Sequence, residues 1–163
     1  KMEVLHMLDI IKIVKENSVR TIFDAAPVGH LPAEVVALAD YITPNETELE
    51  VLSNKPGASI EEAARSLLAT DEQTVIITLG SQGARYVRRD GTALIRSYKV
   101  DVVDTTGAGD AFNGGLAVAL AEGRGLAEAI AFANATAALC VTKPGTAPSM
   151  PQREEVEALL AST

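Results

Sequence analysis

A short run of small residues, Gly107-Ala108-Gly109, leads directly into a carboxylate, Asp110. Apolar residues predict a strand over 98–103 before this run, and a helix over 111–121 after it. Small residues where a strand turns into a helix leave backbone N–H groups pointing in one direction, which makes an anion site. An anion site beside a potential base indicates chemistry on a phosphate.

Two functions suit Asp110 in this position. As a general base, it would accept the proton of an attacking hydroxyl group. As a helix cap, it would only satisfy backbone amides at the helix start, where Asp is common. The amides of Gly107, Ala108 and Gly109 would stabilise a transferring phosphate, and they are equally compatible with a tight turn that binds nothing.

The elements that position this run alternate along the chain. Strands are expected at 21–24, 41–42 and 74–79, and a hairpin at 84–97. Helices are expected at 4–17, 33–39, 46–52, 59–69, 111–121, 126–141 and 152–160. Continuous apolar strands that alternate with helices predict an α/β fold with a mainly parallel sheet. Ligands of such sheets bind at the carboxyl ends of the strands.

Composition excludes several classes of function. The chain has 163 residues, of which 47% are hydrophobic, and this is enough for one globular core. Its net charge of -8 comes without a basic face, so no nucleic-acid binding is expected. No apolar run approaches the ~18 residues that cross a bilayer, so no membrane span is expected. Cys140 is the only cysteine, which fits a cytoplasmic protein.

Four segments, in the same order, resemble the motifs of the ribokinase-like (PfkB) carbohydrate kinases. They are TPNETE at 43–48, TLGSQG at 78–83, DTTGAGDAFNG at 104–114 and TKPGTAPS at 142–149. The resemblance implies the family's three-layer, doubly wound α/β fold. It also implies ATP-dependent phosphorylation of a sugar hydroxyl, with D-ribose as the first candidate substrate. In that reaction Asp110 would be the base, and the backbone of 107–109 would be the anion hole.

The same resemblance assigns residues to the cofactors. Those that would line ATP are Thr78, Gly80, Ser81, Gly83 and Asn134. Asn45 and Glu48 would organise Mg²⁺ and the phosphates, with a capped, solvated helix start as the alternative for this pair. Asn134 has an alternative role as a helix-packing residue. A K⁺ ion near the anion hole would use Asp104, Thr106, Cys140, Lys143, Gly145 and Ser149, mostly through backbone carbonyls.

Members of this family are about twice as long as the chain, so residues 1–163 are expected to form the C-terminal, nucleotide-binding half. The N-terminal half, with the sugar-binding residues and the lid strands, would then be absent. The isolated chain is expected to be inactive, and the whole protein to be a homodimer. Two alternatives remain open. The chain would be a nucleotide-binding module, or it would belong to a fructokinase, a deoxyribokinase or a nucleoside kinase.

Overall fold

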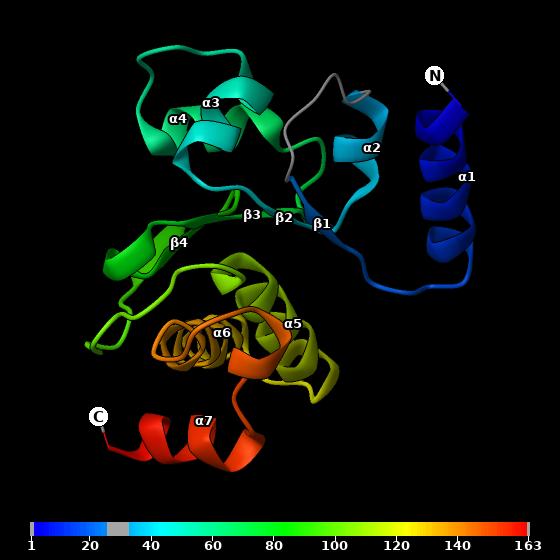
Figure 1. Cartoon of the computed structure of the whole chain (residues 1–163). Coiled ribbons are helices and arrows are strands. Elements are labelled where there is room, and N and C mark those ends of the chain that lie inside the picture. The colour runs from blue at the N-terminus through cyan, green and yellow to red at the C-terminus, as the bar shows by residue number, and fades with distance from the viewer. Residues whose placement is uncertain (1, 26–32, 163) are drawn as a thin grey trace. The chain divides into compact units, whose positions relative to one another are not determined.

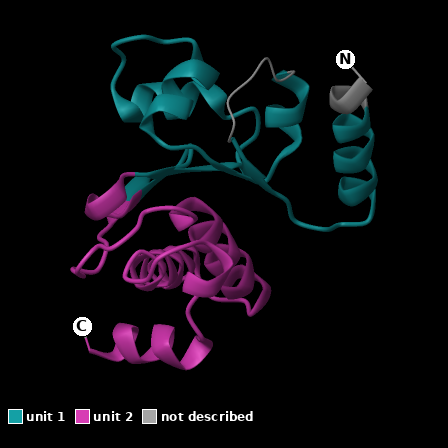
Figure 2. Cartoon of the chain, in the orientation of Figure 1, with its two compact units in different colours: residues 1–78, 85–93 teal, residues 79–84, 94–163 magenta. Residues whose placement is uncertain are grey.

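The computed structural model describes residues 2–25 and 33–162. The chain divides into two compact units (Figure 2), which are residues 1–78 with 85–93, and residues 79–84 with 94–163. Each unit has its own set of buried apolar side chains. Within the described ranges, no helix combines the length and the apolar character that a bilayer crossing requires.

The first unit is built on three parallel strands, β1 (Ile22–Asp24), β2 (Tyr41–Thr43) and β3 (Thr74–Thr78). Val75, Ile76 and Ile77 of β3 are fully buried, as expected for a parallel strand that is covered on both faces. The sheet continues in the order β1-β2-β3-β4-β5 with β4 (Ala84–Val87) and β5 (Thr92–Ile95). These parallel strands and their connecting helices confirm the predicted α/β class.

The helices of the first unit are α1 (Met2–Glu16), α2 (Ala33–Leu38), α3 (Glu46–Ser53) and α4 (Ile60–Leu67). Figure 1 shows α2, α3 and α4 on one side of strands β1 to β3. The predicted caps are present. The side chains of Asn45 and Ser59 accept hydrogen bonds from the third residue of α3 and α4, respectively, which fixes where each helix begins.

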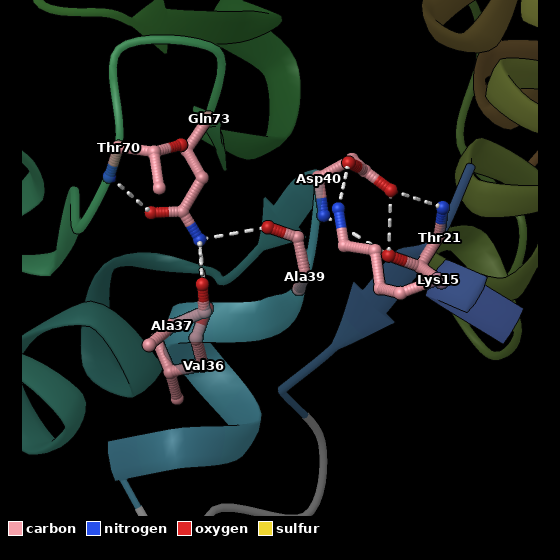
Figure 3. Close-up of polar contacts among 8 residues, drawn as sticks. All are labelled: Lys15, Thr21, Val36, Ala37, Ala39, Asp40, Thr70 and Gln73. Carbon is pink, nitrogen blue, oxygen red and sulfur yellow. Dashed lines mark hydrogen bonds and ion pairs between the residues drawn. The ribbon is translucent and has the colours of Figure 1, made fainter. Parts of the chain in front are cut away.

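Two polar side chains tie the segments of the first unit together (Figure 3). Gln73 is 2% exposed and spans the ends of α2 and α4. Its amide nitrogen donates to the carbonyls of Val36, Ala37 and Ala39, and its Oε1 accepts from the Ala69 and Thr70 amides. Asp40 accepts from Lys15 of α1 and from both donors of Thr21, just before β1.

The second unit contains α5 (Ala108–Ala121), α6 (Leu126–Cys140) and α7 (Arg153–Ala161), with single 3₁₀ turns at Gly80–Gln82 and Ala147–Ser149. Helices α5 and α6 approach closely at Gly115. A Cβ on Gly115 would lie 2.7 Å from Thr136 Oγ1 and 3.1 Å from Ala133 Cα. The absence of a side chain at Gly115 therefore lets the backbones of α5 and α6 approach each other closely.

Two sequence expectations are wrong around the glycine-rich run. Residues 98–103 form no strand, and Val102 and Val103 are 59% and 63% exposed. The amides of Val103 and Asp104 donate instead to Val141 O, at the end of α6. Helix α5 begins at Ala108 and not at residue 111, since the Ala111 amide already bonds Gly107 O at 2.9 Å. Apolar content alone cannot show which partner takes a backbone amide.

Candidate active site

Residues Gly107–Asp110, called the anion turn below, form the start of α5. Gly107 is the N-cap residue and has φ 80°, a left-handed conformation that favours glycine. The Ala108 amide donates to Thr105 O at 3.2 Å. The amides of Gly109 and Asp110 have no acceptor inside the helix, because helical bonds cannot reach the first turn. A Cβ on Gly109 would meet no atom within 4 Å, so a ligand has room to approach this backbone.

Asp110 is the third residue of α5, and its side chain is exposed. It therefore lies in the turn whose free amides carry the positive end of the helix dipole. Because the Asp110 carboxylate is exposed, the hydroxyl group of a substrate can reach it from solvent. The arrangement combines one proton acceptor with amides that bind negative charge, as phosphoryl transfer requires.

Asp104 joins the anion turn to the loop after α6. Its Oδ1 accepts from the amide and the hydroxyl of Thr106 at 2.9 and 2.6 Å, and its Oδ2 accepts from the Gly145 amide at 3.0 Å. The Thr106 hydroxyl, followed by the Gly145 and Thr106 amides, lowers the pKa of Asp104 to about 2. The carboxylate is consequently charged at neutral pH and holds the two segments together.

Ser149 is the centre of the loop after α6 and is fully buried. Its hydroxyl oxygen lies 2.7 Å from Gly145 O, 2.6 Å from Thr146 O and 3.1 Å from Cys140 Sγ. One hydroxyl proton cannot serve both carbonyl oxygens. These carbonyls lie four and three residues before Ser149, so the contacts are the back-bonding that a serine commonly makes within its own helical turn. The K⁺ site at this loop stays a prediction. The side chain of Lys143, in the same loop, is paired with Glu155 of α7 at 3.0 Å.

Two of the predicted nucleotide residues of the second unit, Gly83 and Asn134, meet one backbone segment, 95–97. Gly83 has φ 104°, and a Cβ there would lie 2.1 Å from Ile95 O. Asn134, which is 4% exposed, donates its side-chain amide to Ile95 O at 2.9 Å and to Arg96 O at 3.3 Å. Gly80 and Ser81, at the preceding turn, are exposed. The side-chain amide of Asn134 thus fixes α6 to the backbone at the end of β5.

The predicted residues of the first unit lie at the carboxyl ends of β2 and β3. Asn45 forms an isolated parallel bridge with Thr78, and the Thr78 amide donates to Pro44 O at 3.0 Å. Glu48 accepts from the Asn45 amide at 2.8 Å, and Asn45 Oδ1 accepts from the Glu48 amide at 2.9 Å. This reciprocal capping box is the capped helix start that was the alternative for the pair.

Within residues 2–25 and 33–162, no three His, Cys, Asp or Glu side chains gather as metal ligands. A closed protein cage for a divalent ion is therefore missing from these residues. Mg²⁺ commonly keeps several waters and takes one or two carboxylates together with substrate phosphates. In the structure Asn45 Oδ1 and Glu48 Oε2 are both used by the capping box, and the Mg²⁺ assignment of this pair stays a prediction.

Sequence reasoning missed the packing of Thr146 on the anion turn. A Cβ on Gly107 would lie 3.4 Å from Cβ and Cγ2 of Thr146, which therefore packs over the N-cap residue. No spacing along the chain links these two residues, because Gly107 precedes α5 and Thr146 follows α6. The only sequence signal for Thr146 was its place in the TKPGTAPS motif at 142–149.

Known proteins resemble the chain along most of its length. Residues 2–153 match the pfkB family carbohydrate kinase model. A ribokinase of Bacillus subtilis (strain 168) is 42% identical over 153 residues, which are 94% of this chain and 50% of that protein. Fructokinase-1 of Oryza sativa subsp. japonica is 40% identical over 131 residues, 76% of this chain and 40% of that one.

Solved structures extend this likeness to the fold. The structure of Arabidopsis thaliana ribokinase complexed with ribose and ATP matches with a TM-score of 0.88 at 35% identity, covering 94% of this chain and 51% of that one. The predicted resemblance and the predicted α/β fold are both confirmed. The chain spans about half the length of curated relatives that it matches, among them ribokinases of Haemophilus influenzae, Bacillus subtilis and Staphylococcus aureus.

Proposed function

Because the chain belongs to the pfkB family of carbohydrate kinases, we propose that it supplies the nucleotide-binding and catalytic half of an ATP-dependent sugar kinase. The observation that carries this proposal is the anion turn. It combines the exposed carboxylate of Asp110 with the free amides of a helix start and with the open backbone at Gly109.

In the proposed reaction, Asp110 accepts the proton of the sugar hydroxyl that attacks the γ-phosphate. The amides of residues 107–109 bind the oxygens of the transferring group, where negative charge develops. The amide of Ala108 exchanges its 3.2 Å bond to Thr105 O for the phosphate. The amide of Gly109 has no such bond to exchange. A positioned base contributes about 10²- to 10⁴-fold to the rate.

The cofactors follow the same assignment. ATP lies against Thr78, Gly80, Ser81, Gly83 and Asn134. Asn45 and Glu48 hold Mg²⁺ through water, and the ion neutralises phosphate charge when bound. K⁺ binds at the loop after α6, with support from the resemblance of segments 104–114 and 142–149 to the motifs of the family.

D-ribose is the proposed acceptor, and ribose 5-phosphate the product. Support comes from relatives named ribokinase and from the Arabidopsis thaliana protein solved with ribose and ATP. A rice fructokinase is 40% identical to this chain, close to the 42% of the Bacillus subtilis ribokinase. That near-equality favours fructose as the second candidate. It also indicates that sugar choice depends on residues beyond this half.

A chimera tests the proposal. The N-terminal half of the Bacillus subtilis ribokinase is joined to this chain, and ADP release is measured with ribose, fructose, deoxyribose and a nucleoside. We expect ribose-dependent release, and a loss of about 10²-fold or more in kcat for Asp110→Asn. ATP affinity, measured by calorimetry, should stay within a few fold in that variant.

Two outcomes would contradict the proposal. Near-normal kcat in Asp110→Asn would remove this residue from catalysis. A chimera that binds ATP but releases no ADP with any sugar would favour a binding module. The chain on its own should bind ATP without turnover, and ribose-dependent ADP release by residues 1–163 alone would show that no second half is needed.

A further inference from the structure

We propose that the exposed face of α5 docks the N-terminal half of the kinase, and that this contact brings the sugar to Asp110. The inference deepens the proposed function and rests on it. The face, called the outer face below, consists of Asp110, Gly114, Ala117, Val118 and Ala121, which are all exposed. Steps of three and four residues connect them, so they lie on one side of the helix.

The first support is the composition of α5. Between Asp110 and Glu122 the helix has no charged residue, and its only polar side chain is that of Asn113. The opposite face, which includes Phe112 and Leu116, is buried. A helix that is apolar on all sides is normally buried on all sides, because a surface helix keeps a polar face toward water. The composition of the outer face therefore indicates that another apolar surface covers it.

Helix α7 shows the contrast with a helix that faces water. Its exposed residues include Arg153, Glu154 and Glu155, and Val156 is its one buried residue. Of the exposed residues of α5, only Asp110 carries a charge. The two helices thus differ in the chemistry of their exposed sides, and only that of α5 suits an apolar partner.

The second support is the room over this face. Within the described ranges, a Cβ on Gly114 would meet no atom within 4 Å, and Val118 is 45% exposed. Gly114, Ala117 and Ala121 have at most a methyl group as a side chain, so a partner can approach the helix backbone closely. Val118 supplies the one larger apolar side chain of the contact.

The third support identifies the occupant. The chain covers 48% of the Haemophilus influenzae ribokinase and 50% of the Bacillus subtilis ribokinase. The proposed kinase thus contains about as many residues again, which is enough for a separate apolar partner. A second copy of the chain would also cover the face, but it would bring no residue that the chain lacks. The N-terminal half would bring new residues to the site.

The fourth support is the place of Asp110 at one end of the outer face. An element that covers the face reaches this carboxylate as well. The chain is 42% identical to a ribokinase and 40% identical to a fructokinase, so residues that choose between the two sugars are expected outside it. Docking on the outer face brings such residues beside Asp110 and excludes water from the carboxylate.

Cysteine labelling tests the contact. Val118→Cys is made in the 163-residue chain and in the chimera with the N-terminal half of the Bacillus subtilis ribokinase, and the rate of the reaction with a maleimide is measured. The native Cys140 is fully buried and should add little background. We expect the new thiol to react freely in the chain alone and at least about 10-fold more slowly in the chimera. Ala158→Cys, on the exposed side of α7, is the control and should react equally in both proteins.

A charged side chain tests the link to the reaction. Ala117→Arg should change the melting temperature of the chain alone by less than about 1 °C, because Ala117 is exposed and Arg is a good helix former. In the chimera it should lower the melting temperature by about 5 °C or more, because the charge would be buried without a partner. Ribose-dependent kcat should fall about 10-fold or more, since the sugar would be displaced from Asp110. Ala158→Arg is the matched control and should change neither quantity.

Equal labelling of Val118→Cys in the chain and in the chimera would overturn the inference and leave the proposed function intact. A chain that is destabilised by Ala117→Arg would also overturn it, since the face would then be covered from within the chain. Labelling of the chain alone that slows as its concentration rises would assign the face to a second copy and overturn it as well. If the thiol is protected but the original chimera phosphorylates no sugar, the proposed function fails, and the delivery of the sugar fails with it.

Discussion

Asp40 in the first unit and Asp104 in the second accept nearly the same set of hydrogen bonds. Each receives the amide and the hydroxyl of one threonine, Thr21 or Thr106. The third donor differs, because it is the Lys15 ammonium for Asp40 and the Gly145 amide for Asp104. The two carboxylates thus share the same pair of threonine donors but differ in their third donor.

The difference lies in what each carboxylate joins. Asp40 connects helix α1, the entry to β1 and the entry to β2, far along the chain from the anion turn. Burial opposes the ionisation of Asp40, but the bonds from Lys15 and Thr21 outweigh it and hold its pKa below the ordinary value. Asp104 has only neutral donors and joins the residue before the anion turn to the loop after α6. The comparison suggests that the first carboxylate serves folding and the second serves the site.

Gln73 provides the largest expected effect, because the first unit depends on buried polar side chains (Figure 3). Gln73→Met would leave two amides and three carbonyls without their partner. We expect the free energy of unfolding to fall by about 3 kcal/mol or more, as measured by urea denaturation. Gln82→Met is the control, since Gln82 is exposed. Equal effects of both changes would refute the dependence on Gln73.

Helix packing should produce the next effect, in the second unit. Gly115→Ala places a methyl group 2.7 Å from Thr136 Oγ1, and should lower the free energy of unfolding by about 1–3 kcal/mol. Gly114→Ala meets no atom within 4 Å and should be neutral or stabilising. Melting temperatures of the two variants check this contrast. A tolerated Gly115→Ala would show that α5 and α6 are packed more loosely.

Asp40→Asn should have a smaller effect, about 1–2 kcal/mol, with a defined dependence on pH. The folded-state pKa of Asp40 lies below its ordinary value of 3.8. Its contribution is therefore fully present above about pH 4, and is lost as the pH falls through the lowered pKa. Denaturation curves between pH 7 and pH 2 should show a steeper acid loss in the original chain than in Asp40→Asn. Parallel curves would contradict this account.

Asp104→Asn should change the free energy of unfolding least of the four. Its carboxylate is partly exposed and lacks a cationic partner among the described residues. The loss should be smaller than that of Asp40→Asn, as measured by urea denaturation. If Asp104→Asn unfolds the chain more than Asp40→Asn does, the two carboxylates have the same role and the comparison fails.

Much of the fold was predictable because it depends on local chemistry. The run 74–79 is continuously apolar, and it forms the buried strand β3 over Thr74–Thr78. Asn45 and Ser59 cap the helices that their residue types predicted. Asn45 and Thr78 also lie side by side, because the carboxyl ends of neighbouring parallel strands share one edge.

The failures came from partners that are distant along the chain. The run 98–103 has the composition of a strand, but the amides at its end bond to Val141 O. The anion turn was predicted from its small residues. The Asp104–Gly145 bond and the packing of Thr146 on Gly107 were not, because no local pattern encodes a contact between two loops.

The sequence by itself determined the α/β class, the family and the residue types at the anion turn, since these depend on periodicity, capping and motif order. Only the tertiary structure decided that α5 begins at Ala108, and that the two oxygens of Asp104 hold two separate loops. Backbone amides can bond to any acceptor that the fold brings near. Which acceptor each one takes is decided by packing, and the direction of the anion turn depends on that choice.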